Sequence, residues 1–339
     1  MNNLKKVGLS ALAGSLVAFS ANAVEMSVSG VAEVTYTTDG GNAGGHTGNA
    51  WGSNTSLTFS GTGDVGFGEA TIVRTLNDRA KGASTATHSN YVSAYQLLDM
   101  GSMGRLSFDA HGGGLDGIKP WDDVLPTAYE EVWNGVSSHG VGTAAASNDT
   151  IGYRNTFSGV TVSLARTSGG DSNSGDGGND DATDTRTTDV MLVANGSAIG
   201  IDGLEIGIGN STAENPTAGE TNSDSTTTLG HIKYSTGPVS VGYRMADDQS
   251  GTKGANGHTT DAYAIAFAVN ENLSISYASQ DREFDRPSTT NVTESSDAIN
   301  ASYTMGAASF RATIADSSNT SGVTGDKNEH MELSVVLAF

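Results

Sequence analysis

The sequence predicts an all-β fold, a 16-stranded antiparallel β-barrel that spans a membrane, and three observations lead to this prediction. Gly accounts for 45 of 339 residues and charged residues for only 16%, which suits many short strands joined by turns. Apolar and polar residues alternate along sixteen short segments, which is the period of a strand with two different faces. The connections are alternately short and long, as in membrane-spanning barrels.

The first 23 residues are predicted to be a targeting segment that is removed. MNNLKK is basic, VGLSALAGSLVAF is apolar, and Ala21-Asn22-Ala23 fits a cleavage site. The apolar run is too short to cross a bilayer as a helix. We therefore expect residues 24–339 to form the barrel, with 15 basic and 38 acidic residues and a net charge of −23.

The expected strands fill the mature chain in order. They cover residues 25–37, 55–61, 67–77, 90–98, 104–110, 150–156, 160–167, 187–195, 204–211, 226–235, 239–246, 260–269, 272–281, 297–304, 308–316 and 329–339. Short turns lie at one end of these strands and long polar loops at the other. An even number of strands places both termini at the end with the short turns, which would be periplasmic.

The apolar face of each strand is expected to point outward. In the last strand, one face carries Met331, Leu333, Val335, Leu337 and Phe339. The opposite faces carry Ser, Thr, Gly and occasional Arg, which suits a wet lumen, and aromatic residues gather at strand ends, where interface girdles lie. In hydrocarbon every backbone group must be paired, so the sheet must close. The alternative is a soluble exported β-sandwich or solenoid whose apolar face is buried.

The longest connection, residues 111–148, is expected to fold into the lumen and narrow it. A loop of this length is usually functional or disordered. This one contains two Trp and two Pro residues, which indicate packing. Its five carboxylates would form the acidic side of a constriction: Asp116, Asp122, Asp123, Glu130 and Glu131.

Strand parity selects the basic residues that would face the same lumen. These predicted pore-wall residues are Arg105, Arg154, Lys233, Arg244 and Arg311. Arg166 shares a face with Val162 and Leu164 and is expected at the rim. Arg74 lies in a strand of ambiguous parity, where Ile72 and Leu76 share its face, and is kept as a further pore-wall candidate. Because the net charge is strongly negative, we expect the pore to prefer cations.

Several segments resemble those of Gram-negative trimeric general porins. Residues 24–36 (VEMSVSGVAEVTY) resemble the first porin strand, and residues 90–108 (NYVSAYQLLDMGSMGRLSF) the hairpin before the constriction loop. Residues 148–164 (NDTIGYRNTFSGVTVSL) resemble the strand, turn and strand that follow this loop. The family's common loop motif P-E-F-x-G is absent, and the nearest segment is Pro120-Trp121-Asp122-Asp123.

The resemblance implies a 16-stranded barrel in the outer membrane of a Gram-negative bacterium, with a water-filled pore for passive diffusion of small hydrophilic solutes and ions. It also implies a homotrimer in which the loop at residues 78–89 contacts a neighbouring subunit. The C-terminal alternation ending at Phe339 resembles the family's signal for the outer-membrane assembly machinery. Outer-membrane lipid and lipopolysaccharide are implied as further partners.

Other functions have little support in the sequence. Gly61-x-Gly63-x-x-Gly66 matches a dinucleotide-binding pattern but lies in a predicted turn with no helix after it. No nucleophile, zinc or nucleotide motif is present, so we expect no enzyme and no cofactor. Strong acidity argues against nucleic-acid binding. The acidic loop at residues 169–184 could bind divalent cations weakly. A substrate-specific porin and a soluble exported adhesin remain alternatives.

Overall fold

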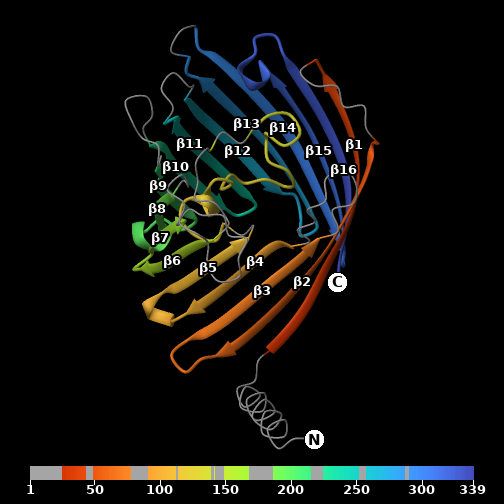
Figure 1. The fold of residues 1–339 in the computed structure, drawn as a ribbon. Helices are drawn as coiled ribbons and strands as arrows, with labels where there is room; N and C mark the ends of the chain where they lie inside the picture. The colour runs from red at the N-terminus through yellow and green to blue at the C-terminus, as the bar shows by residue number, and fades with distance from the viewer. Residues whose placement is uncertain are drawn as a thin grey trace, which may run out of the picture.

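The computed structural model describes residues 25–42, 49–77, 91–111, 114–138, 141, 149–167, 186–214, 224–251, 257–286 and 290–339. Sixteen antiparallel strands close into one barrel, because β1 pairs with β16 (Figure 1). The predicted fold class is therefore confirmed. The expected targeting segment at residues 1–23 and the loops at residues 78–89 and 169–184 lie outside the described ranges. None of the described helices is long and apolar enough to cross a membrane.

The strands follow the chain order without a crossover. They are β1 (Glu25–Gly41), β2 (Trp51–Asp64), β3 (Glu69–Asn77), β4 (Tyr91–Asp99), β5 (Arg105–His111), β6 (Thr150–Phe157), β7 (Val160–Thr167), β8 (Arg186–Asn195), β9 (Leu204–Glu214), β10 (Ser225–Thr236), β11 (Val239–Gln249), β12 (His258–Ala268), β13 (Leu273–Phe284), β14 (Val292–Met305), β15 (Ala308–Ser318) and β16 (Lys327–Ala338). Short helical turns are η1 (Gly101–Met103), η2 (Lys119–Trp121), α2 (Gly196–Ile199) and η3 (Thr320–Gly322).

The first two strands are longer than the sequence predicts. They were expected at residues 25–37 and 55–61, but the ladder between β1 and β2 continues to the pair Tyr36 and Trp51. The two rings contact edge to face, with centroids 5.1 Å apart. Polar residues such as Ser53 and Asn54 hide this extension in the sequence, because backbone pairing continues where the apolar alternation stops.

The apolar strand faces point outward, as predicted. Ile151, Ile208 and Ile299 are each more than 60% exposed, whereas Ser163, Ser211 and Thr227, on the opposite faces of β7, β9 and β10, are buried. A soluble sandwich would reverse this arrangement. A closed barrel can expose such a face to lipid, because all of its strands pair with their neighbours.

The seam that closes the barrel is fixed by the last residue. The backbone N–H of Gly30 donates to the Phe339 carbonyl at 2.7 Å, and the Phe339 N–H donates to the Gly30 carbonyl at 2.9 Å. The Phe339 ring covers Gly30 so closely that a Cβ there would lie 2.3 Å from ring carbon Cε2. A side chain at position 30 would therefore displace the terminal ring.

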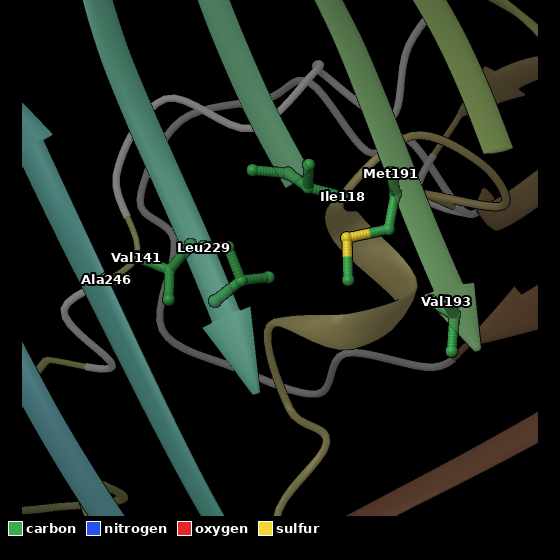
Figure 2. Packing of buried hydrophobic residues seen from close by; sticks show 6 residues of the cluster. All are labelled: Ile118, Val141, Met191, Val193, Leu229 and Ala246. Carbon is green, nitrogen blue, oxygen red and sulfur yellow. The ribbon is translucent and has the colours of Figure 1, made fainter. Parts of the chain in front are cut away.

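The buried apolar residues lie inside the barrel, where the connection between β5 and β6 packs on the wall. We call residues 112–149 the lumen loop. One cluster joins Ile118 and Val141 of the loop to Met191 and Leu229 of the wall (Figure 2). A second cluster joins Val132 and Val136 to a row of wall alanines, which are Ala264, Ala278, Ala298 and Ala315. The core of the protein is thus the contact between loop and wall.

Candidate functional site

The lumen loop follows the inner wall from β5 to β16. Small wall residues let it approach closely. A Cβ on Gly209 would lie 2.8 Å from Ile118, and a Cβ on Gly242 would lie 2.8 Å from Pro126. The expectation that the loop folds into the lumen therefore agrees with its described residues, 114–138 and 141 (Figure 1).

Asp116 fixes the start of the loop. Its Oδ1 lies 2.8 Å from Arg105 Nη2 and 3.0 Å from Arg154 Nε, so two guanidinium groups share one carboxylate. The Ser107 hydroxyl donates to its other oxygen. Its side chain is 1% exposed. The sequence predicted that Asp116 lines the constriction. In the structure its side chain lies on the wall side of the loop, where it is the counter-ion of two wall arginines.

Backbone groups next to Asp116 complete this attachment. The Gly117 N–H donates to Ser163 Oγ at 2.9 Å, and the Ile118 N–H donates to Asp189 Oδ2 at 3.3 Å. Gly117 has a φ of +72°, a conformation that glycine adopts without strain. A Cβ at Gly117 would also lie 2.4 Å from Asp189 Oδ2. The glycine therefore lets the chain turn while it touches the wall.

Aromatic residues of the loop cover two of the wall arginines. Arg154 Cζ lies 4.7 Å from the centroid of the Trp121 ring, and Arg244 Cζ lies 5.0 Å from that of Trp133. Such cation–π contacts stabilise by about 0.5–2 kcal/mol, more when water is excluded. The two Trp rings therefore stack on guanidinium groups of the wall.

Arg244 holds the middle of the loop and is 0% exposed. It donates to the carbonyl oxygen of Asp122 and, from Nη2, to Gln280 Oε1 at 2.9 Å. The Asp122 carboxylate is also buried and lies 2.5 Å from Lys119 Nζ. Burial raises the pKa of Asp122, while Lys119 opposes that rise. Neither Asp122 nor Arg244 therefore presents its charge to the lumen as the sequence predicted.

The next loop acids lie nearer to the open pore. Asp123 is exposed, and Glu130 and Glu131 are partly exposed. Burial raises the pKa of Glu130, and the nearby carboxylates of Glu332 and Glu33 raise it further. Burial also raises the pKa of Glu131.

Tyr129 links this acidic part of the loop to β16. Its hydroxyl donates to Glu332 Oε1, and Arg311 Cζ lies 5.5 Å from the centroid of its ring. On β14, Asn300 both accepts from the Glu130 N–H at 3.2 Å and donates to the Glu130 carbonyl at 3.0 Å. These contacts hold Glu130 beside two wall carboxylates.

Glu33 and Glu332 were not among the predicted site residues. Both lie on the lumen faces of their strands, since Glu33 accepts from Ser334 Oγ at 2.5 Å and Glu332 accepts from the loop. The alternation of β16 put Glu332 on the polar face, which was the available signal. Its pairing with a loop residue 203 positions away was not visible in the sequence.

The end of the loop is held by β13, β15 and β16. The Val136 carbonyl accepts from Ser317 Oγ and from Asn328 Nδ2, each at 3.0 Å. Gln280 Nε2 donates to the Ser138 carbonyl at 3.0 Å. Gly135 packs on the ring of His330, which in turn lies 2.5 Å from Asp39. The loop is therefore attached along its described length.

Arg74 does not share the lumen face of the other basic candidates. It pairs directly with Phe59, which is 39% exposed on the outer surface, and paired residues lie on the same face of a sheet. Its Nη1 donates to the carbonyl oxygens of Val73 and Tyr95. The pore-wall assignment of Arg74 is therefore a correction: it shares the outward parity of Ile72 and Leu76.

The wall formed by β1 to β4 lies across the barrel from β11, since β3 is eight strands away from it. Arg74 is the one Lys or Arg in these four described strands. The lumen faces of β2 and β3 carry hydroxyl pairs, namely Thr58 with Thr75 at 3.0 Å and Thr62 with Thr71 at 3.2 Å, and that of β1 carries Glu33. The described strands β1 to β4 therefore contribute no basic side chain to the lumen.

The last pore-wall candidate, Lys233, faces the lumen on β10. Its Nζ lies 3.2 Å from Glu205 Oε1, and His231 Nε2 lies at the same distance from that oxygen. Arg166 lies on the outer face, as its parity predicts, where it bonds Thr188 and lies 3.5 Å from Glu214.

Comparison with known proteins agrees with this architecture. The sequence profile described as Gram-negative porin matches residues 8–270. No curated protein matches the chain in sequence. Among solved structures, OmpF of Salmonella typhi in complex with daunomycin superposes with a TM-score of 0.69 at 10% identity, covering 93% of this chain and 98% of its own.

Two further porins share the fold at similarly low identity. The trimer form of OmpT from Vibrio cholerae has a TM-score of 0.64 at 10% identity, covering 94% of this chain and 100% of its own. An anion-selective porin from Comamonas acidovorans has a TM-score of 0.66 at 12% identity, covering 93% and 100%. Since the family profile spans most of the sequence and the closed barrel holds a loop in its lumen, this chain belongs to the Gram-negative porin family, whose members are outer-membrane channels and not enzymes.

Proposed function

We propose that this general diffusion porin prefers cations. The observation that supports the proposal is the pairing of its lumen bases. Arg105 and Arg154 share the carboxylate of Asp116, and Lys233 is paired with Glu205. Arg244 is enclosed by the loop. Arg311, the remaining predicted base on the lumen side, lies over the Tyr129 ring, so four of these five bases are paired with a carboxylate or enclosed by the loop.

The acids of the pore are compensated less well. Glu33, Glu130 and Glu332 form one group in which each carboxylate is near another. On the neighbouring strands β2 and β3, the lumen faces carry hydroxyl pairs and no Lys or Arg. In a narrow water-filled pore, such an imbalance raises the local concentration of cations and lowers that of anions. The fold alone would not decide this, since an anion-selective porin shares it.

The test is the reversal potential of the purified protein in a planar bilayer under a KCl gradient. We expect the sign that corresponds to K⁺ permeation exceeding Cl⁻ permeation, and a smaller effect at high salt because the Debye length falls from about 10 Å at 0.1 M to about 3 Å at 1 M. A reversal potential of the opposite sign would disprove the proposed preference.

As pH falls, the preference for cations should weaken at a higher pH than the one at which ordinary carboxyl groups take up protons. Glu130 and Glu131 have raised pKa values, so they take up protons as pH falls while exposed glutamates, with a pKa of about 4.3, remain charged. Protonation removes negative charge from the pore. We therefore expect the K⁺/Cl⁻ permeability ratio to decline above pH 4.5, and less in Glu130→Gln/Glu131→Gln. A ratio constant from pH 7.5 to 4.5 would contradict this.

We also propose that three copies assemble side by side. OmpT of Vibrio cholerae has been solved in a trimer form with this fold. In this chain, Arg74 places a guanidinium on the outer face of β3, where contact with lipid tails would cost about 2–4 kcal/mol at mid-membrane. A neighbouring subunit covering β3 would remove that contact. Three equal conductance steps per insertion are expected, and single steps would oppose the proposal.

A further inference from the structure

The connection between β15 and β16 bends into the extracellular mouth of the barrel. Residues 319–326, which we call the rim strap, lie at the extracellular end because the short turns mark the periplasmic side. The Ser321 N–H donates to Glu294 Oε1 at 3.1 Å, and a Cβ on Gly322 would lie 2.9 Å from the Phe284 ring. Glu294 of β14 and Phe284 of β13 face the lumen, since they alternate with the outward residues of these strands. The rim strap therefore lies inside the rim, over strands that it does not connect.

Side chains from outside the rim strap hold it on two sides. Arg286, just beyond β13, donates to the Gly322 carbonyl, and Asn319 Nδ2 of the strap donates to a carbonyl of β14 at 2.9 Å. On the other side, Asn42, just beyond β1, donates to the Gly325 carbonyl at 3.3 Å. The rim strap thus reaches from β13 to β1 along the rim of the closed sheet.

The rim strap covers an ion pair on the inner wall. Glu294 is 1% exposed, and its Oε2 lies 3.9 Å from Arg282 Nη1. Arg282 Cζ lies 4.5 Å from the centroid of the Phe284 ring, and Gly322 packs on the same ring. Burying a carboxylate is costly unless it is paired and hydrogen-bonded. The Ser321 N–H therefore stabilises the buried Glu294, and Glu294 in turn holds the strap against the wall.

The backbone of the rim strap adopts a conformation that residues with side chains seldom take. Asn319 and Ser321 have φ values of +54° and +55°, in the left-handed region that disfavours a Cβ. Such conformations persist only where the surrounding contacts impose them, and they gather at functional sites. The inward path of the strap is therefore imposed by its contacts with the wall.

We propose that the rim strap narrows the extracellular entrance of the pore, in series with the lumen loop. Glu294 and Arg286 are the positioning residues that keep it there, and they thereby limit the size of solutes that enter from outside. The two segments meet at one wall residue, since Ser317 Oγ lies 2.8 Å from Thr320 Oγ1 and donates to the Val136 carbonyl. Without its two polar attachments the strap would move away from the wall and widen the entrance. Solute size is a property separate from the proposed cation preference, so either can fail without the other.

Thiol labelling of intact cells tests this proposal, because the chain has no cysteine of its own. Asp123→Cys places one thiol on an exposed residue of the lumen loop, and uncharged maleimides with polyethylene glycol chains of increasing length are added outside. Glu294→Ala and Arg286→Met, each made in this background, remove a hydrogen bond to a charged group, which should raise the labelling rate with the largest reagents about fivefold. The rate with N-ethylmaleimide should stay nearly the same, because this small reagent already passes the entrance.

Three more variants in the same background separate the strap from a general effect on the barrel. Gly322→Ala, whose Cβ would collide with the Phe284 ring, should act like the other strap variants without changing a charge. Glu294→Gln keeps an oxygen that can accept from the Ser321 N–H and should label like the Asp123→Cys protein. Arg166→Met removes a base from the outer face at the same end of the barrel and should also leave the rates unchanged.

Heat-modifiable gel mobility shows which variants form the barrel. The proposal is overturned if the folded strap variants label with large reagents no faster than the Asp123→Cys protein. It is also overturned if Arg166→Met speeds labelling as much as they do. In either case the rim strap only closes a hairpin and does not limit entry.

Discussion

Replacing Asp116 with Asn should shift the ion preference of the pore toward anions. The substitution keeps the shape of the side chain but leaves the guanidinium groups of Arg105 and Arg154 without their shared counter-ion. A unit charge about 10 Å from an ion in water changes its energy by about 0.4 kcal/mol, roughly a factor of two. Since cations are repelled and anions attracted, the K⁺/Cl⁻ permeability ratio should fall roughly two- to fourfold at low salt.

The control for this prediction is Asp202→Asn, which removes the same formal charge from the short turn between β8 and β9. It should leave the reversal potential nearly unchanged. Heat-modifiable gel mobility shows whether each variant still forms the barrel. A properly folded Asp116→Asn channel with the ratio of the wild type would mean that the two arginines do not influence permeating ions.

Replacing Arg244 with Met should loosen the lumen loop. Met is nearly as long as Arg but cannot donate to the Asp122 carbonyl or to Gln280 Oε1. Leaving two buried acceptors without this donor costs roughly 2–6 kcal/mol, and the cation–π contact with Trp133 is lost as well. Two kcal/mol corresponds to a change of about 30-fold in a population, so states with a displaced loop should become observable.

Single-channel recording measures this effect directly. Arg244→Met should show a higher mean conductance and more open-channel noise than the wild type. Lys233→Met is the matched control, since it removes one positive charge from a lumen residue that pairs with Glu205 and not with the loop. If both variants have the same quiet current as the wild type, Arg244 does not hold the loop in place.

Asp116 and Arg244 were selected from the sequence as charges that face the pore, whereas in the structure they attach the loop to the wall. The acids at positions 116 and 122 were predicted to line the constriction because the loop is long and acidic. Loop sequence has no period, so nothing in it distinguishes a carboxylate that meets water from one that meets a wall arginine. The distinction depends on which strands the loop crosses.

Strand residues were more predictable. Arg105, Lys233 and Arg311 lie on the lumen faces that alternation assigned to them, because successive side chains of any strand point to opposite sides. Arg74 is the exception. It alternates in step with Ile72 and Leu76, and its pairing with Phe59 places this face outward.

The sequence by itself determined the barrel, the outward apolar faces and the strong negative charge, because period-two alternation and composition are local properties of the chain. Only the tertiary structure decided which charges reach the pore. Tyr129 and Glu332 are 203 residues apart and touch, while Asp116 and Asp122 are buried beside arginines of β5, β6 and β11. The electrostatics of a pore depend on such distances between remote residues, which appear only when the sheet has closed around the loop.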